Sequence, residues 1–291
     1  MKRLSLVLAV VMTLLCVFTA CGEEKSGGLS INPDGAAATT QIVSGLTGES
    51  YTMPLSSSKI VSLSPAATMI LEELGAASKL IGVDSVSAEY VTSSAQTITA
   101  ADAVGLAPEA IFVDEADKDA IGATDIPVFV IPTAKSIADI NSLVRICGKV
   151  AGITPDTLVT KVTNALSVAQ LGSAVYTTKI RAYVDLGDGE TVGAGTYVTE
   201  MLYAAGFENI CTIDGFGSMS EEDVIAANPE FIFTTGSVDD YLNNPAFAEV
   251  TAVVDGQVHS INEKEIRFGS SYVTNCVSVM YAAADATRAD E

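Results

Sequence analysis

The sequence predicts an α/β fold of two lobes, each built on a mainly parallel sheet covered by helices. Short apolar strands alternate with helices from residue 59 onward, which is typical of parallel sheets. An internal repeat divides this pattern. When Pro108 is aligned with Pro229, residues 102–112 (DAVGLAPEAIF) match residues 223–233 (DVIAANPEFIF) at Asp, Pro, Glu, Ile and Phe. We therefore expect two similar lobes that enclose a cleft, which is a favoured place for a ligand.

Residues 1–20 have the pattern of an export signal. Lys2 and Arg3 form a basic start, and the apolar run that follows is short compared with the roughly 20 residues of a transmembrane helix. The residues ending at Cys21 resemble a lipobox, which predicts cleavage before Cys21 and its lipidation. An ordinary secretory signal and an uncleaved anchor are the alternatives. Residues 21–39 are rich in Gly, Ser, Ala and Glu and predict a flexible tether.

The N-terminal lobe is expected over residues 40–135. It opens with a hairpin over 40–54, which turns near Gly45–Gly48. A strand over 60–63 leads to Ser64 and Pro65, a capping residue and a first-turn proline that together predict a helix start. Gly75 is its expected end. Further apolar strands are predicted at 80–83, 111–113 and 128–131.

Two linking helices are expected over residues 136–174. Ser136 and Asp139 form an approximate capping box for the first, and Thr154-Pro155 starts the second. The C-terminal lobe is expected over residues 175–291. Its predicted elements are a strand from 180, helices at 196–206 and 220–228, strands at 231–235 and 257–261, and a final helix at 270–286.

Composition and motifs exclude several function classes. The formal net charge is -21, so the chain repels nucleic acid, and no nucleic-acid partner is expected. The sequence contains no GxSxG and no P-loop, and GxGxxG is incomplete because Val198 holds the last glycine position. The single histidine, His259, would have to serve any Ser-His-acid hydrolase. With so few His and Cys residues, we expect no metal site, no cofactor and no enzyme activity.

Several segments, in this order, resemble the periplasmic binding proteins for iron–siderophore, haem and cobalamin uptake. They are KIVSLSPAATMILEELGAASKLIGV (59–83), TAADAVGLAPEAIFV (99–113), SMSEEDVIAANPEFIFTTG (218–236), AVVDGQVHSIN (252–262) and IRFG (266–269). The resemblance covers roughly residues 40–288. It implies two Rossmann-like lobes joined by a long helix, with limited hinge motion. It also implies an ABC permease and its ATPase as partners. Together with the lipobox-like segment, it leads us to expect a monomeric, extracytoplasmic lipoprotein that is lipid-anchored to the cell membrane.

Candidate ligand-binding residues follow the predicted strands, because open parallel sheets bind ligands beyond the carboxyl ends of their strands. They are Ser64, Pro65, Asp84, Tyr90, Tyr197, Gly236 and Arg267, with Asp114, Glu115, Pro132 and Thr133 as further loop residues. Arg267 is the strongest candidate, because it matches a cleft position of the family. For the others a structural alternative stays open. Ser64 can serve only as a helix cap, the two tyrosines as packing residues, and the two acids as solvated side chains.

The expected ligand is a bulky, neutral or weakly charged metal chelate. A trianionic catecholate complex would need several converging cations, and Arg267 is the only clear cleft arginine. A corrinoid such as cobalamin is preferred, then an iron–siderophore or haem; an exported enzyme or a sensor on the same scaffold are the alternatives. In the family, one surface glutamate on each lobe meets permease arginines. Glu222 matches the second-lobe position, whereas the first lobe has Ala101, with Asp102 adjacent.

Overall fold

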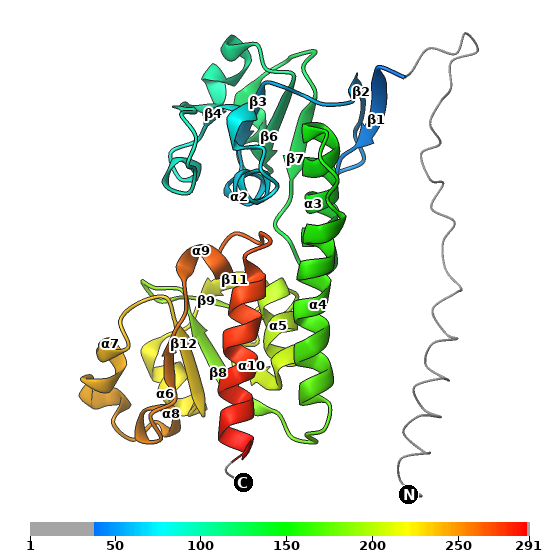
Figure 1. Cartoon of the computed structure of the whole chain (residues 1–291). Helices are drawn as coiled ribbons and strands as arrows, with labels where there is room; N and C mark the ends of the chain where they lie inside the picture. The colour runs from blue at the N-terminus through cyan, green and yellow to red at the C-terminus, as the bar shows by residue number, and fades with distance from the viewer. Residues whose placement is uncertain (1–37, 290–291) are drawn as a thin grey trace, which may run out of the picture. The chain divides into compact units, whose positions relative to one another are not determined.

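Two sheets, one in each half of the sequence, form the framework of the protein (Figure 1). The computed structural model describes residues 38–289. The predicted signal segment, Cys21 and the tether up to residue 37 lie outside the described residues. The N-terminal lobe is built on the sheet whose strands lie within residues 60–131, and the C-terminal lobe on the sheet whose strands lie within residues 180–260.

The N-terminal lobe holds five strands in the order β5-β4-β3-β6-β7, and every pair is parallel. The strands are β3 (Ile60–Leu63), β4 (Leu80–Val83), β5 (Gln96–Thr97), β6 (Ala110–Asp114) and β7 (Val128–Ile131). Between them lie α2 (Pro65–Glu73) and the 3-10 helices η1 (Ala77–Lys79), η2 (Ser87–Glu89), η3 (Ala100–Leu106) and η4 (Lys118–Ile121). The predicted hairpin is confirmed as antiparallel β1 (Thr40–Ser44) and β2 (Ser50–Pro54).

The C-terminal lobe has a mixed sheet. Strands β8 (Ile180–Asp185), β10 (Phe207–Asn209), β12 (Phe231–Thr234) and β13 (Val258–Ser260) run parallel, whereas β9 (Glu190–Val192) and β11 (Phe216–Ser218) run antiparallel to their partners. The reversal after β8 has a local cause: Gly187, Asp188 and Gly189 all have positive φ. Three successive residues of this kind turn the chain back on itself.

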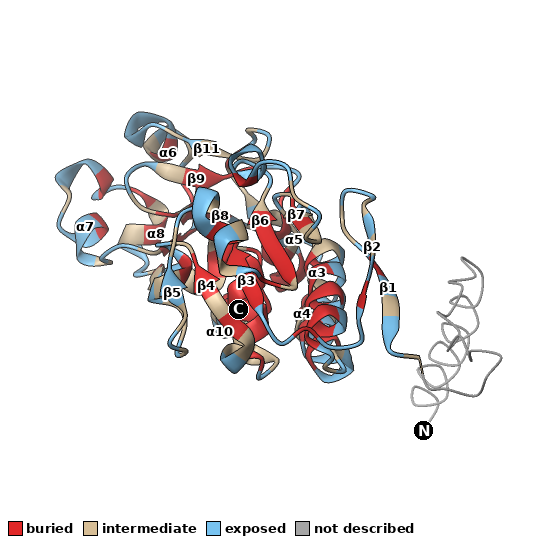
Figure 2. Ribbon diagram, turned by 90° about the horizontal axis from the view of Figure 1, so that it is seen from above, coloured by how far each residue is buried: buried red, intermediate tan, exposed pale blue. Residues whose placement is uncertain are grey.

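Six helices and one 3-10 helix complete the C-terminal lobe. They are α5 (Tyr197–Ala205), α6 (Glu221–Ala227), α7 (Asp239–Leu242), η5 (Pro245–Phe247), α8 (Thr251–Val254), α9 (Glu263–Ile266) and α10 (Val273–Ala289). The predicted helices at 196–206, 220–228 and 270–286 correspond to α5, α6 and α10. Buried residues concentrate on the strands of both sheets and on the inward faces of the helices (Figure 2).

The connection consists of two helices, α3 (Ile137–Ala151) and α4 (Asp156–Ser173), as the sequence pattern predicts, and not of the one long helix that the resemblance implies. The capping box is confirmed, since Ser136 Oγ accepts from the Asp139 backbone N–H and the Asp139 carboxylate accepts from that of Ser136. Gly152 ends α3 in a left-handed conformation. The Asn141 side chain then donates to Thr163 at 3.1 Å, so the helices pack side by side in opposite directions.

Both helices belong to both lobes. On α3, Ile137 and Ile140 pack into the core of the C-terminal lobe, and Leu143 packs into the core of the N-terminal lobe. On α4 the order is reversed: Leu158 lies in the N-terminal core and Val162 in the C-terminal core. Because each helix is anchored in both cores, the pair forms a stiff connection that limits how far the lobes can move relative to one another.

Candidate ligand-binding cleft

A cavity of about 400 Å³ lies between the two lobes. The N-terminal lobe contributes residues that follow β6 and β7, and the C-terminal lobe contributes Tyr197 at the start of α5 and the loop after α9. Its position agrees with the expectation that a ligand binds beyond the carboxyl ends of the strands. The lining residues are Leu46, Ala66, Asp114, Glu115, Ala116, Ile131, Pro132, Thr133, Ala134, Lys135, Asp139, Ile140, Leu143, Tyr197, Arg267, Phe268 and Gly269.

Asp114 is the most perturbed acid of this cavity. Burial raises its pKa to about 6, and a hydrogen bond from Ser64 opposes part of that rise. Ser64 is fully buried, caps α2 by accepting from the Ala67 backbone N–H at 3.4 Å, and does not line the cavity. Pro65 is the buried first residue of α2. The structure therefore places Ser64 and Pro65 behind the cavity wall, where Ser64 supports Asp114.

Asp84 and Tyr90 belong to the N-terminal lobe, where they follow β4 and η2, and neither lines the cavity. The Asp84 carboxylate accepts from the Ser87 backbone N–H at 2.8 Å and from its hydroxyl at 2.6 Å, which holds the turn after β4. The Tyr90 ring contacts Phe268 of the opposite lobe, with ring centroids 5.4 Å apart. Tyr90 thus contributes to contact between the lobes.

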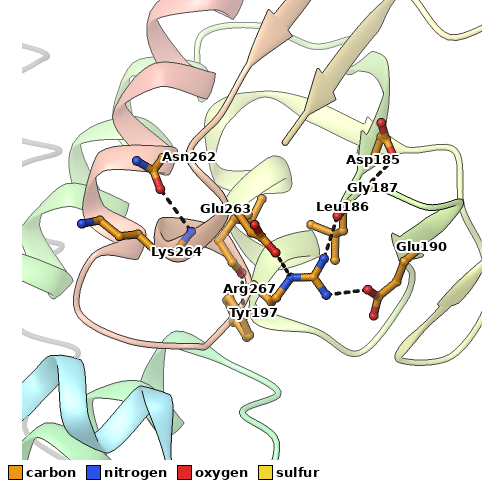
Figure 3. Close-up of polar contacts among 10 residues, drawn as sticks. Asp185, Leu186, Gly187, Glu190, Tyr197, Asn262, Glu263, Lys264 and Arg267 are labelled. Atoms are coloured by element: carbon orange, nitrogen blue, oxygen red, sulfur yellow. Dashed lines mark hydrogen bonds and ion pairs between the residues drawn. The ribbon is translucent and has the colours of Figure 1, made fainter. Parts of the chain in front are cut away.

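Arg267 lines the cavity but is held by its own lobe (Figure 3). Its guanidinium donates to Glu190 at 2.5 Å and to the Leu186 carbonyl at 2.6 Å, and Nε lies 2.8 Å from Glu263. Two carboxylates therefore compensate its charge. Arg267 fastens the loop after α9 to the β8–β9 turn, and it offers little free positive charge to a ligand.

Tyr197 is buried, and only part of its ring reaches the cavity. Its hydroxyl donates to the Ile266 carbonyl at 2.5 Å and accepts from the Gly269 backbone N–H at 2.9 Å. One hydroxyl thereby closes a tight turn with Arg267 and Phe268 at its tip. Gly269 is needed there because its φ is +57° and a Cβ would lie 3.1 Å from Ala134. Tyr197 is therefore chiefly a positioning residue for this turn.

Five of the seven candidate ligand-binding residues lie outside the cavity lining, and several lining residues were not predicted: the five are Ser64, Pro65, Asp84, Tyr90 and Gly236. Gly236 follows β12, where its N–H donates to Thr234 Oγ1 at 2.9 Å, outside the cavity lining. Leu46 reaches the cavity from the β1–β2 hairpin. The hairpin itself was predicted, but no local pattern indicated that it would contribute to the cavity. Lys135 and Asp139 could have been found from their place after β7, next to Pro132 and Thr133.

The candidate docking residues differ in their surroundings. Glu222 is exposed in the first turn of α6, which Ser220 caps. The Asp102 carboxylate accepts from the Thr99 hydroxyl at 2.6 Å and the Thr99 backbone N–H, and these bonds lower its pKa. The equivalent pair in the repeat is Ser220 with Asp223, which forms a similar cap. Asp102 therefore corresponds to Asp223, and Ala101 corresponds to Glu222.

The histidine and the cysteines of residues 38–289 have structural surroundings. The His259 ring stacks on Phe231 with centroids 5.5 Å apart and bonds to Gln257. The three cysteines of this region, Cys147, Cys211 and Cys276, are buried free thiols. No cluster of three or more His, Cys, Asp or Glu in the described region could hold a metal ion. None of the described helices is long and apolar enough to cross a membrane.

A family model of the periplasmic binding proteins matches residues 60–265, which is more than half of the chain. The chain belongs to the periplasmic binding protein family. A cobalamin-binding protein of Halobacterium salinarum is 26% identical over 237 residues, covering 72% of this chain. The chain spans 64% of the length of that relative, just under two thirds.

Solved structures agree with this membership. CeuE of Helicobacter pylori, in a structure described as a Ni–His complex, has a TM-score of 0.71 at 17% identity and covers 84% of this chain and 88% of its own. The periplasmic vitamin B12 binding protein BtuF of Vibrio cholerae has a TM-score of 0.65 at 19% identity, covering 81% and 99%. The periplasmic haem-binding protein RhuT of Roseiflexus has a TM-score of 0.63 at 23% identity, covering 78% and 99%. These similarities establish the α/β fold.

Proposed function

We propose that this protein is the solute-binding component of an ABC importer and that it captures a corrinoid or a similar metal chelate between its lobes. The observation that carries the proposal is the inter-lobe cavity of a periplasmic binding protein, set at the carboxyl ends of β6 and β7. The relative from Halobacterium salinarum, which is described as cobalamin-binding, supports a corrinoid as the first choice. A hydroxamate siderophore or haem is the next choice.

The charges around the cavity favour a neutral or weakly charged ligand. Three acidic side chains (Asp114, Glu115 and Asp139) and two basic ones (Lys135 and Arg267) line it. Glu190 and Glu263, which hold Arg267, add two further carboxylates. A highly anionic chelate would be repelled by this excess of acid, whereas a corrinoid or a hydroxamate complex would not be.

The size of the cavity implies motion. Its volume of about 400 Å³ is near the lower end of the roughly 300–1,000 Å³ that holds a drug-sized ligand. Cobalamin is larger than such a ligand, so we expect the lobes to move apart when it enters.

Binding is tested by a thermal-shift screen with cobalamin, cobinamide, haem, a ferric hydroxamate and a ferric tricatecholate. A ligand present at 100 times its Kd should stabilise the folded state by about 2.7 kcal/mol. We expect a rise in Tm with a corrinoid and none with the tricatecholate. A rise with the tricatecholate alone would contradict the proposal.

A charge variant sharpens this test. Glu190→Gln removes one of the carboxylates that compensate Arg267, so the affinity for anionic chelates should increase relative to that for corrinoids. Glu249→Gln is the matched control, because Glu249 is exposed and far along the sequence in the segment after η5. Equal effects of the two variants would show that the local charge at Arg267 does not select the ligand.

We further propose that Glu222 is the main docking residue for the permease. It is exposed, whereas the equivalent Ala101 has no charge and the Asp102 carboxylate is engaged in a helix cap. In transport assays with purified permease and ATPase, Glu222→Gln should impair uptake at unchanged ligand affinity, and Asp102→Asn should do less. Ala101→Glu should strengthen docking, because it restores the repeat. Full activity of Glu222→Gln would remove this residue from the interface.

Cys21 is proposed as the lipidated N-terminus that tethers the protein outside the cytoplasmic membrane. A Cys21→Ser variant should appear in the soluble fraction or retain its signal segment. Wild-type protein that is already soluble and unmodified at Cys21 would contradict lipidation.

A further inference from the structure

Phe268 is a side chain of the C-terminal lobe that lies in the N-terminal lobe. It belongs to the loop between α9 and α10, which lies on the side of the C-terminal lobe that is nearest to α2 (Figure 1). Phe268 packs against the hydrophobic core of the N-terminal lobe, contacts Tyr90 at 5.4 Å between centroids, and forms part of the cavity wall. It therefore fills inter-lobe space that would otherwise be open to a ligand.

The backbone on both sides of Phe268 is fixed to the C-terminal lobe. The Tyr197 hydroxyl bridges Ile266 and Gly269, and Arg267 is bonded to Glu190 and Leu186. These bonds tie the backbone position of Phe268 to the C-terminal lobe, so a separation of the lobes would withdraw the ring from the cleft.

A polar contact closes the same side of the cleft. Glu73, in the last turn of α2, accepts from the Ser271 hydroxyl of the C-terminal lobe and from Lys161 of α4 at 2.6 Å. Glu73 is mostly shielded, with 19% of its side chain exposed. The insertion of Phe268 and the Glu73 contact therefore form and break together.

We propose that Phe268 is a specificity-determining residue that acts as a wedge and restricts the size of the ligand that the closed cleft accepts. The inference rests on the proposed corrinoid function. A large ligand must keep the wedge withdrawn, whereas a smaller one fits beside it. Truncation of the ring should therefore favour the larger of two related ligands.

The test compares cobalamin with cobinamide, which lacks the nucleotide arm and is smaller, by calorimetric titration. If the wedge is withdrawn in about a tenth of the molecules, Phe268→Ala should strengthen cobalamin binding by about 10-fold. It should change cobinamide binding much less. Phe268→Leu retains an apolar side chain and should resemble the wild type. Unchanged affinities, an equal change for both ligands, or weaker binding of both would overturn the proposal, the last because Phe268 would then be a ligand platform.

A ligand-free measurement separates the wedge from the choice of ligand. The sequence has no tryptophan, so Phe268→Trp introduces a single fluorescent reporter. Its emission should be that of a buried indole, poorly quenched by acrylamide, and Glu73→Gln in the same protein should increase quenching. Tyr203→Trp is the control, because Tyr203 is 62% exposed. If neither corrinoid binds, the proposed ligand is wrong and the reporter alone decides the wedge. A Phe268→Trp indole quenched as strongly as the control indole would overturn it.

Discussion

Tyr197→Phe is expected to destabilise the protein through a single oxygen atom. The variant keeps the buried ring but removes the hydroxyl that donates to the Ile266 carbonyl and accepts from the Gly269 N–H. Ile266 is fully buried and Gly269 is buried at the edge of the cavity, so bulk solvent does not directly replace the lost hydroxyl. Leaving one buried polar group unpaired costs about 1–3 kcal/mol. With two such groups in one turn that can partly relax, we expect a loss of about 2–4 kcal/mol.

The assay is urea unfolding followed by far-UV circular dichroism, since the chain has no tryptophan to report unfolding. Tyr203→Phe is the matched control. Its side chain is 62% exposed, and a surface change of this kind alters stability by no more than about 0.5 kcal/mol. If Tyr197→Phe is as stable as the control, the hydroxyl does not hold the turn. The rigid presentation of Phe268 would then be refuted as well.

Two further predictions concern backbone strain and pH. Ala107, which follows the 3-10 helix η3, has φ +48°, so Ala107→Gly should raise the free energy of unfolding by about 0.5–1 kcal/mol, whereas Ala101→Gly inside η3 should lower it by a similar amount. Thermal unfolding of both checks the sign. Burial raises the pKa of Asp114 from 3.8 to about 6, so its contribution to stability is full below the unfolded pKa and is lost as pH rises through 6. Asp114→Asn should gain about 2–3 kcal/mol over the wild type at pH 7 and little at pH 4, and an equal difference at both pH values would contradict this.

Helix starts could be predicted because capping is local. Ser64 with Pro65, and Ser136 with Asp139, each place a polar acceptor or a fixed φ where the first turn needs it, and the structure confirms both. The strands β5 and β9 were missed for the opposite reason. Two or three residues are too few to show a period in the sequence, and β9 exists only because Gly187–Gly189 turns the chain back against β8.

The sequence predicted that ligand-binding residues follow the strands, but it did not predict which strands lie next to the cavity. Asp114 and Arg267 follow predicted elements and reach the cavity, as the rule for parallel sheets suggests. Asp84 follows β4, which is separated from β6 by β3, so the same rule places it too far along the sheet edge. The sheet order β5-β4-β3-β6-β7 depends on which strands pair, and pairing over long sequence distances is not encoded in local patterns. The position of Leu46 depends on packing of the hairpin, for the same reason.

The internal repeat separates residues that fold the protein from residues free to serve function. Glu109 accepts from the Ser58 backbone N–H at 2.6 Å, and Glu230 accepts from that of Arg181 at 2.9 Å, so the repeated Pro-Glu pins each helix–strand unit to the first strand of its sheet. The residue before each proline, Ala107 or Asn228, is left-handed in both lobes.

Folding alone explains these shared positions. In both lobes the glutamate accepts a hydrogen bond from a backbone N–H, and the residue before the proline forms a left-handed turn. The exposed positions Ala101 and Glu222 make no such contact in the described region, yet only one of them is charged. Because folding does not require a charge at either position, the charge of Glu222 is free to bind an external partner. If the proposed function is correct, the repeat therefore predicts an asymmetric contact with a permease, centred on the C-terminal lobe.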